Sequence, residues 1–425
     1  MKAWAVLLLS VIVYAKHDQY EGWKSYYLGP KSQEQLQSIG PLVQQFELDV
    51  FSYVNLEREG VVLVKPEHQD GFTRALEEKG IAYRIHSADV KTALEYDDIA
   101  VEIKRRENLA RKGKELPYDN YQEIEEIAAY LTDIAERYPD RATLVSGADS
   151  FEGRPVYYLK VSTTNFEDTR KPVIFIDGGI HAREWISPPT VTWAIHKLLE
   201  NVTEPDLLER FDWILLPVVN PDGYKYTFTN ERMWRKTRST DQTNTSITCP
   251  GVDGNRNYDF FWNTVGTSSN PCSITYAGSR PFSEVETRVV RSILHEHLDR
   301  IALYLTMHSF GSLILYPWGN DGSLSHNALN LHLVGVAIAD EILAHTLPIF
   351  PRYVVGNAAL AIGYAASGAA EDYAHSIGIP LSYTIELPSL GQGFILDPRY
   401  IEQVCRETWQ GIVVGARMAG DLFVL

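Results

Sequence analysis

Strand-length runs of apolar residues alternate with longer amphipathic stretches over the last three hundred or so residues of this chain. Five runs are rich in β-branched or aromatic residues: 156–161, 173–176, 213–218, 301–305 and 381–385. Nearly continuous apolar runs are typical of strands that are buried on both faces. Helical stretches are expected at 121–138, 186–200, 283–299, 325–346 and 399–418. The pattern predicts an α/β fold, with a mixed, mostly parallel sheet covered by helices.

Two of these helices begin with residues that suit a capping box. Asn120 is followed by Glu123, and Ser283 by Glu286. In such a pair, each side chain accepts a hydrogen bond from the backbone N–H of the other residue. We therefore expect both pairs to mark helix starts.

Residues 16–112 have a different pattern. Short strand-like runs are expected at 23–27, 46–54, 61–64 and 81–85, and helices at 66–79 and 92–112. This order predicts a small α+β open sandwich. A chain of 425 residues has room for two such units of unequal size.

A basic stretch, RRENLARKGK, covers residues 105–114. It is either a solvated linker or a cleavage site for a trypsin-like protease, because exposed basic linkers are readily cut. We favour the second interpretation, in which residues 16–112 form a removable pro-segment. Cleavage after Arg111 or Lys112 leaves the helix at 121–138 whole, although Arg105, Arg106 and Lys114 also qualify.

Residues 1–15 have the pattern of a secretory signal peptide. Lys2 is followed by an apolar run at 5–13 and by the small residue Ala15. The run is too short to span a bilayer, and we expect no later segment to be long and apolar enough to do so. Sequons at Asn201 and Asn244 fit a secreted, extracellular protein.

Composition excludes several classes of function. Lysine and arginine total 39 against 55 aspartates and glutamates, a net charge of −16, so nucleic acids and anionic membranes are poor partners. Three cysteines are too few for a disulfide scaffold or for cysteine-ligated zinc fingers. Cys249 and Cys272 could pair in an oxidising compartment, which leaves Cys405 as a buried thiol.

Candidate metal ligands follow two of the predicted strands. His181 and Glu184 form a His-x-x-Glu pair just past the strand at 173–176, and His308 follows the strand at 301–305. Open α/β sheets bind ligands beyond the carboxyl ends of their strands, and catalytic zinc takes three nitrogen or oxygen ligands and keeps one position open. The competing interpretations are a chance His-x-x-Glu and a core histidine.

Other polar residues suit catalysis and anion recognition. Glu386 ends the strand at 381–385 and could act as a general base, or as a capping or salt-bridging glutamate. Arg235, Asn255 and Arg256 are typical of carboxylate recognition, because the arginine fork pairs with both carboxylate oxygens. Asp253 could orient a ligand histidine.

The chain resembles the zinc metallocarboxypeptidases of the digestive A/B type over nearly its whole length. The motifs HAREW, NPDGY, RMWRKTR, GVDGNRN, HSF before LYPWG, and IELP occur in the family's order. The resemblance implies a signal peptide at 1–15, an activation pro-domain at 16–112 and a catalytic domain at 113–425. It also implies one Zn²⁺ per chain, a disulfide between Cys249 and Cys272, and a monomer in the digestive lumen.

The same resemblance implies a role for each matching residue. His181, Glu184 and His308 would be the zinc ligands, with Asp253 as the partner of a ligand histidine. Glu386 would be the general base and Arg235 would stabilise the oxyanion. Asn255, Arg256 and Tyr364 would hold the terminal carboxylate of a peptide, helped by Arg183. Partners would be peptide C-termini, an activating protease and proteinaceous carboxypeptidase inhibitors.

Substrate preference is expected to depend on Glu371, which matches the residue at the base of the family's side-chain pocket. A buried acid there would favour C-terminal lysine or arginine, because an apolar side chain would leave it unpaired. The family's usual acid is aspartate, and Asp372 is adjacent, so a shift of one residue would change which acid enters. Phe310 stands where the family commonly has tyrosine.

Three alternatives stay open. The same enzyme could prefer apolar or aromatic C-terminal residues. A non-catalytic peptide-binding relative would be expected to have lost a ligand or the base, whereas all four residues are present here. A zinc amidohydrolase acting on a small metabolite would not need the carboxylate clamp or the pro-segment.

Overall fold

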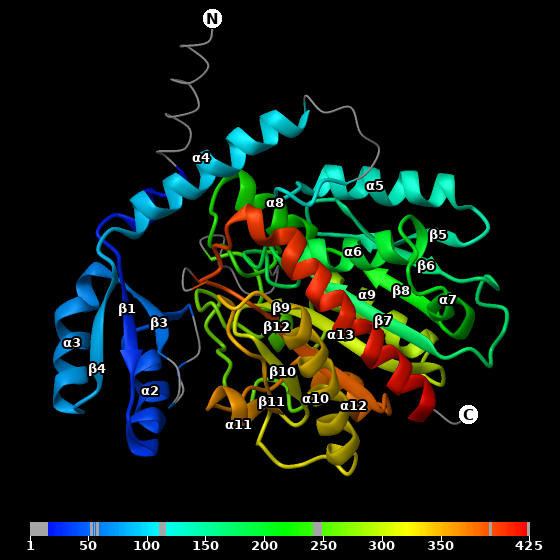
Figure 1. Ribbon diagram of the computed structural model, residues 1–425. Coiled ribbons are helices and arrows are strands. Elements are labelled where there is room, and N and C mark those ends of the chain that lie inside the picture. The colour runs from blue at the N-terminus through cyan, green and yellow to red at the C-terminus, as the bar shows by residue number, and fades with distance from the viewer. Residues whose placement is uncertain are drawn as a thin grey trace, which may run out of the picture.

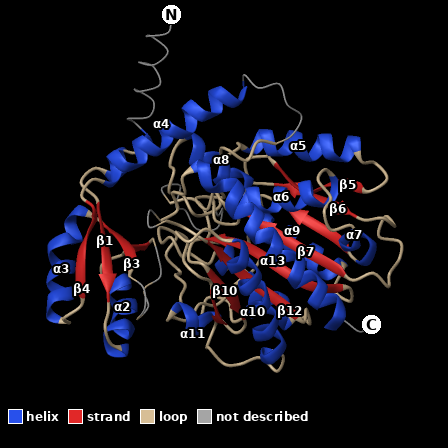
Figure 2. Ribbon diagram, viewed as in Figure 1, coloured by secondary structure: helices blue, strands red, loops and turns tan. Residues whose placement is uncertain are grey.

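The computed structural model describes residues 16–51, 54, 56, 59–109, 116–240, 249–390 and 393–422. The expected signal peptide, the bonds after Arg111, Lys112 and Lys114, and the sequon at Asn244 lie outside these residues. Figure 2 shows the described strands as two separate groups, a small one near the N-terminus and a larger one in the remainder of the chain.

The N-terminal unit is an antiparallel sheet of four strands in the order β2-β3-β1-β4. The strands are β1 (Lys24–Gly29), β2 (Asp49–Val50), β3 (Gly60–Val64) and β4 (Ala82–Ser87). Helices α2 (Gln33–Gln45) and α3 (Gln69–Glu78) pack on the sheet, with Phe46, Phe72 and Leu76 in the shared core. The predicted α+β open sandwich is confirmed.

Two local predictions in this unit differ from the structure. Among the described residues of the strand expected at 46–54, only Asp49–Val50 form a strand, and Phe46 ends α2 and points into the core instead. The helix expected at 66–79 is a 3₁₀ turn, Pro66–His68, followed by α3. A further 3₁₀ turn, Asp18–Tyr20, precedes β1.

Helix α4 (Val90–Leu109) leads from the N-terminal unit toward the larger one and ends near α5 (Ile124–Arg137), as Figure 1 shows. Asn120 donates from Nδ2 to the carbonyl of Val101 in α4. Arg105 pairs with Glu123 and Glu126 at the start of α5. The end of α4 is therefore held by contacts with the larger unit.

The larger unit is built on a mixed sheet of eight strands in the order β11-β10-β12-β9-β7-β8-β6-β5. Its parallel centre consists of β12 (Leu381–Leu387), β9 (Ile301–Ser309), β7 (Val173–Gly178) and β8 (Asp212–Leu216). The remaining strands are β5 (Ala142–Asp149), β6 (Pro155–Val161), β10 (Leu313–Tyr316) and β11 (Val354–Asn357). The mixed α/β architecture is confirmed.

Helices cover both faces of this sheet. Helices α5, α6 (Ser187–Leu199), α10 (Ala328–His345) and α13 (Ile401–Leu422) pack on one face. Helices α9 (Val285–Glu296) and α12 (Ala370–Ser376) pack on the other. Along β7, Ile174 and Ile176 face the helices of the first layer, whereas Phe175 faces α9 and α12. Burial on both sides explains why most residues of the central strands are apolar.

Neither predicted capping box is present. The N-cap of α5 is Glu123, which forms a capping box with Glu126, while Asn120 contacts α4 instead. The N-cap of α9 is Glu284, without a side-chain cap bond. In both cases the helix starts later than the sequence pattern indicated, at Ile124 and at Val285.

Helix α10 is long and apolar enough, by length and composition, to cross a membrane. The expectation that no later segment reaches this threshold was therefore wrong. In the structure, Leu331, Val334 and Ile338 of α10 are buried in the same core as α13. Only this face of the helix is in the core, because Leu329 and Leu333 are exposed.

Candidate active site

The HAREW segment, residues 181–185, follows β7 after a two-residue turn at Gly179 and Ile180. Gly179 has a φ of +67°, and a Cβ there would lie 3.3 Å from the carbonyl oxygen of Pro217, so glycine suits this turn. The N–H of Gly179 donates to Oγ of Ser187 at the start of α6, over 2.6 Å. The turn places His181 and Glu184 together beyond the carboxyl end of the strand, as the sequence predicted.

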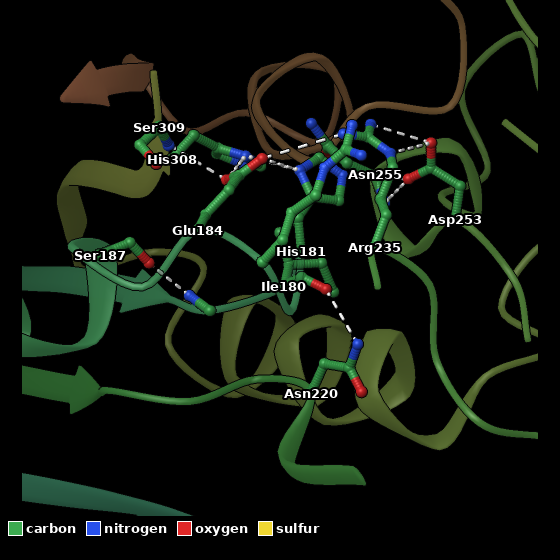
Figure 3. A network of polar contacts seen from close by, with 12 residues as sticks. Ile180, His181, Glu184, Ser187, Asn220, Arg235, Asp253, Asn255, His308 and Ser309 are labelled. Carbon is green, nitrogen blue, oxygen red and sulfur yellow. Dashed lines mark hydrogen bonds and ion pairs between the residues drawn. The ribbon is translucent and has the colours of Figure 1, made fainter. Parts of the chain in front are cut away.

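His181, Glu184 and His308 converge on one point (Figure 3). Nδ1 of His181 lies 2.7 Å from Oε1 of Glu184, and Nδ1 of His308 lies 3.1 Å from Nδ1 of His181 and 3.0 Å from Oε2 of Glu184. All three residues are buried, and their ligand atoms lie within 4.8 Å of one another. Two imidazole nitrogens and one carboxylate are a donor set that fits zinc.

Asp253 joins this cluster to Arg235. Its Oδ1 lies 3.0 Å from Nε2 of His181, and its Oδ2 accepts from Nε and Nη2 of Arg235 over 3.1 and 3.0 Å. Burial alone would raise the pKa of Asp253, but the adjacent Arg235 and His181 lower it well below its ordinary value. Asp253 therefore stays a carboxylate that can orient both residues.

Glu386 lies beside His308, because β12 and β9 pair in parallel with these residues in register. Its Oε2 is buried and has no hydrogen-bond partner among the described residues. Burial and the nearby Glu184 raise the pKa of Glu386 to about 8. A raised pKa makes the carboxylate a stronger proton acceptor, which suits a general base.

One cavity is lined by most of the predicted residues. They are His181, Glu184, Arg235, Asn255, Arg256, His308, Tyr364, Glu371 and Glu386. Arg183 and Asp253 do not line it. Its remaining wall is largely apolar and includes Leu315, Ala358, Ile362 and Ala369. A peptide terminus and its last side chain can thus be enclosed beside the metal-ligand cluster.

Glu371, rather than Asp372, lines the cavity. Glu371 is 4% exposed, and its Oε2 has no hydrogen-bond partner among the described residues. Asp372 instead accepts hydrogen bonds from the backbone N–H groups of Gly319 and Asn320. The interpretation that placed Asp372 in the pocket does not fit this geometry.

Asn255 and Arg256, which are expected to hold the terminal carboxylate, make their hydrogen bonds mainly with backbone groups. Oδ1 of Asn255 accepts from the N–H of Ala370 over 2.8 Å, while Arg256 donates to the carbonyls of Asn255 and Gly266. Tyr364 follows α11 (Ala358–Ile362) and is 37% exposed. The two buried residues are therefore rigidly held, and Tyr364 stands at the mouth of the cavity.

The N-terminal unit reaches into this site. Val50 and Phe51 line the cavity, and Asp49 pairs with Arg183. Phe51 packs edge-on against Phe394, which also contacts Phe310 and lies under the guanidinium of Arg183. The sequence pattern pointed to no role for Asp49, Phe51 or Phe394, because their contacts depend on how the two units dock.

The predicted disulfide between Cys249 and Cys272 is present, with a Cα–Cα separation of 4.9 Å. Cys405 is a buried free thiol in α13. The metal-ligand cluster of His181, Glu184 and His308 contains none of these three cysteines.

Comparisons with known proteins agree with this site. A zinc carboxypeptidase family model matches residues 127–411, and a carboxypeptidase activation peptide model matches residues 26–97. Carboxypeptidase B of Helicoverpa zea is 67% identical over 427 residues, covering 100% of both chains. Carboxypeptidase B of Astacus astacus is 40% identical over 312 residues, covering 72% of this chain and 100% of the relative.

Two solved structures of carboxypeptidase relatives are also similar to this chain. Carboxypeptidase A from Helicoverpa armigera is 42% identical and superposes with a TM-score of 0.90, covering 95% of this chain and 99% of that one. Bovine thrombin-activatable fibrinolysis inhibitor, in complex with tick carboxypeptidase inhibitor, is 34% identical with a TM-score of 0.66, covering 72% and 99%. This chain belongs to the zinc carboxypeptidase family and is a metallocarboxypeptidase that is made as a zymogen with an activation peptide.

Proposed function

We propose that the activated enzyme removes lysine or arginine from the C-terminus of peptides. The observation that carries this preference is the buried, unpartnered carboxylate oxygen of Glu371 in the cavity wall. An ammonium or guanidinium group would pair with it, whereas an apolar side chain would leave a buried charge without a partner. Relatives of this chain are named both carboxypeptidase B and carboxypeptidase A, so their names alone do not assign the preference.

The terminal carboxylate of the peptide would be bound by groups that donate hydrogen bonds and carry positive charge. Asn255 and Arg256 are buried beside the cavity and offer amide and guanidinium N–H groups to a terminal carboxylate. Tyr364, at the mouth, would close over the bound residue, and Arg183 would contact the peptide further from its end. Because these groups recognise a free carboxylate, the enzyme would act only on C-terminal residues.

Catalysis would use the residues around the metal-ligand cluster. His181, Glu184 and His308 would hold zinc, which when bound supplies Lewis acidity to a water molecule and a carbonyl. Glu386 would take the proton from the attacking water and later give it to the leaving amine. Arg235, oriented by Asp253, would donate to the oxygen that becomes negative in the transition state.

Latency would come from the N-terminal unit as the activation pro-domain, residues 16–112. Val50 and Phe51 occupy part of the cavity wall, and Asp49 engages the Arg183 that a peptide would need. Arg105 lies within α4 and pairs with Glu123 and Glu126, which favours Arg111 or Lys112 as the bond cut by a trypsin-like protease. The catalytic domain, residues 113–425, would then be released.

Secretion is part of the same proposal. Residues 1–15 would be removed as a signal peptide, and the mature protein would act as a monomer in the extracellular digestive lumen. Proteinaceous carboxypeptidase inhibitors would be partners, since a structural relative was solved with tick carboxypeptidase inhibitor.

The test compares peptides that differ only in a C-terminal Lys, Arg or Phe, before and after trypsin treatment. The untreated protein should be nearly inactive, and the treated protein should release Lys or Arg faster than Phe. A chelator should abolish activity and added zinc should restore it. Equal or faster release of Phe would support the apolar alternative, and activity that survives removal of zinc would refute the metalloenzyme mechanism.

A further inference from the structure

Asn220 lies between the two segments that carry His181 and Arg235. It is the N-cap of α8 (Pro221–Thr229) and is fully buried. Figure 3 shows its side chain below the metal-ligand loop, directed at the carbonyl of Ile180. Its position suggests a task beyond starting a helix.

Every polar atom of the Asn220 side chain is used. Nδ2 donates to the carbonyl of Ile180 over 3.2 Å and to the carbonyl of Lys236 over 3.0 Å. Oδ1 accepts from the N–H of Gly223 over 2.9 Å, which is the helix cap. Ile180 directly precedes His181 and Lys236 directly follows Arg235, so one amide group joins the two segments.

Backbone contacts reinforce this junction. The N–H of Asn220 donates to the carbonyl of Gly179, and the N–H of Ala182 donates to the carbonyl of Arg235. A Cβ on Gly223 would lie 2.5 Å from Nδ2 of Asn220 and 2.6 Å from the carbonyl oxygen of Lys236. Only glycine lets the first turn of α8 approach so closely, so the packing holds the asparagine amide in place.

We propose that Asn220 is a positioning residue that sets the separation between His181 and Arg235. The inference rests on the proposed function, in which the metal held by His181 and the guanidinium of Arg235 act on the same carbonyl. A small displacement of one relative to the other would then slow the reaction more than it would weaken substrate binding. Asn220 itself is buried and does not line the cavity.

The competing explanation is that Asn220 only caps α8. Asn220→Ser separates the two roles, because serine is also a good N-cap but has no amide to donate to Ile180 and Lys236. Asn220→Asp is a second variant of almost the same shape, and it keeps the accepting oxygen while it removes the NH₂ group.

The matched control is Asn327→Ser. Asn327 is the N-cap of α10, and its Nδ2 donates to the carbonyl of Pro380 over 2.8 Å. Pro380 precedes β12, whereas Glu386 lies near the other end of that strand. The control therefore removes an amide-to-carbonyl bond of the same kind at the edge of the sheet away from the cavity.

The experiment measures zinc affinity by competition with a chelator, kcat and KM after trypsin treatment, and the melting temperature of the metal-free zymogen. Both Asn220 variants should lose about 10–100-fold in kcat or zinc affinity, while KM stays within about threefold. Asn327→Ser should keep wild-type kcat and zinc affinity, and its melting temperature should fall less than that of Asn220→Ser, because Asn327 is only half-buried and makes no side-chain cap bond.

Two outcomes are decisive. If the Asn220 variants keep wild-type kcat and zinc affinity and lose only thermal stability, the residue is merely a cap and the positioning role is refuted. If the wild-type protein neither holds zinc nor cleaves peptides, the proposed function itself fails.

Discussion

Arg183 and Asp49 form a two-point ion pair across the boundary between the two units. Nη1 of Arg183 lies 2.5 Å from Oδ2 of Asp49, and Nη2 lies 2.8 Å from Oδ1. The arginine is buried, and the ring of Phe394 lies 4.1 Å from its guanidinium carbon. A carboxylate of the N-terminal unit thus occupies an arginine that the family resemblance assigns to substrate.

Weakening this ion pair should raise the activity of the uncut zymogen. Asp49→Asn keeps the shape of the side chain but removes its charge, which leaves Arg183 buried with a weaker partner. We expect activity of the uncut protein toward a small peptide to rise by about tenfold, equivalent to about 1.4 kcal/mol. The activity after trypsin treatment should not change.

Glu59→Gln is the control for this measurement. Glu59 pairs with Arg84 within the N-terminal unit, and both side chains are well exposed, so the pair contributes little. Latency should be the same as in the wild type. If Asp49→Asn is as inactive as Glu59→Gln before cleavage, the ion pair has no part in inhibition.

Glu386→Gln should abolish most of the activity without removing the metal. The substitution leaves His181, Glu184 and His308 intact but takes away the group that accepts a proton. We expect kcat to fall by about 100–10,000-fold, with zinc content unchanged. A loss smaller than about tenfold would mean that another group acts as the base.

Glu286 should make the protein less stable as pH rises. It is buried in α9, one of its oxygens has no partner among the described residues, and burial together with Glu284 raises its pKa from 4.5 to about 8. Between these values the folded protein holds a proton that the unfolded chain releases, so the free energy of unfolding falls as pH increases.

Glu286→Gln removes this dependence. Urea unfolding of the zymogen should show the variant gaining stability relative to the wild type between about pH 5 and about pH 8, by about 2 kcal/mol or more. Glu296→Gln, at the exposed end of the same helix, should show no such trend. A difference that is constant with pH would show that Glu286 does not titrate in this way.

The central strands and the metal-ligand cluster were predictable because their signals are local. An apolar run such as 301–305 predicts a doubly buried strand, and His308 follows it by three positions. The edge strands β5 and β11 were missed because their residues are less uniformly apolar. Strand β10, which lies inside the sheet, is apolar throughout but has only four residues, too short a run to predict a strand by itself. In β5, for example, Leu144 and Val145 are flanked by polar or small residues.

Relationships between distant residues could not be read from the sequence. Asp49 and Arg183 are 134 positions apart, and the pairing depends on how the two units dock. Asn120 and Glu123 satisfied the capping-box pattern, but α4 provides a better partner for the Asn120 amide. The choice between Glu371 and Asp372 likewise depended on α12, whose first turn directs only one of them into the cavity.

The preference for a basic C-terminal residue depends on Glu371, and one ratio tests it most directly. Peptides ending in lysine or norleucine differ chiefly in the ammonium group, so the ratio of their kcat/KM values measures recognition of that charge. The activated wild type should favour lysine by about 100-fold or more, and Glu371→Gln should reduce this ratio by at least about tenfold. A wild-type enzyme that cleaves norleucine as well as lysine, or a ratio that Glu371→Gln leaves unchanged, would contradict the account.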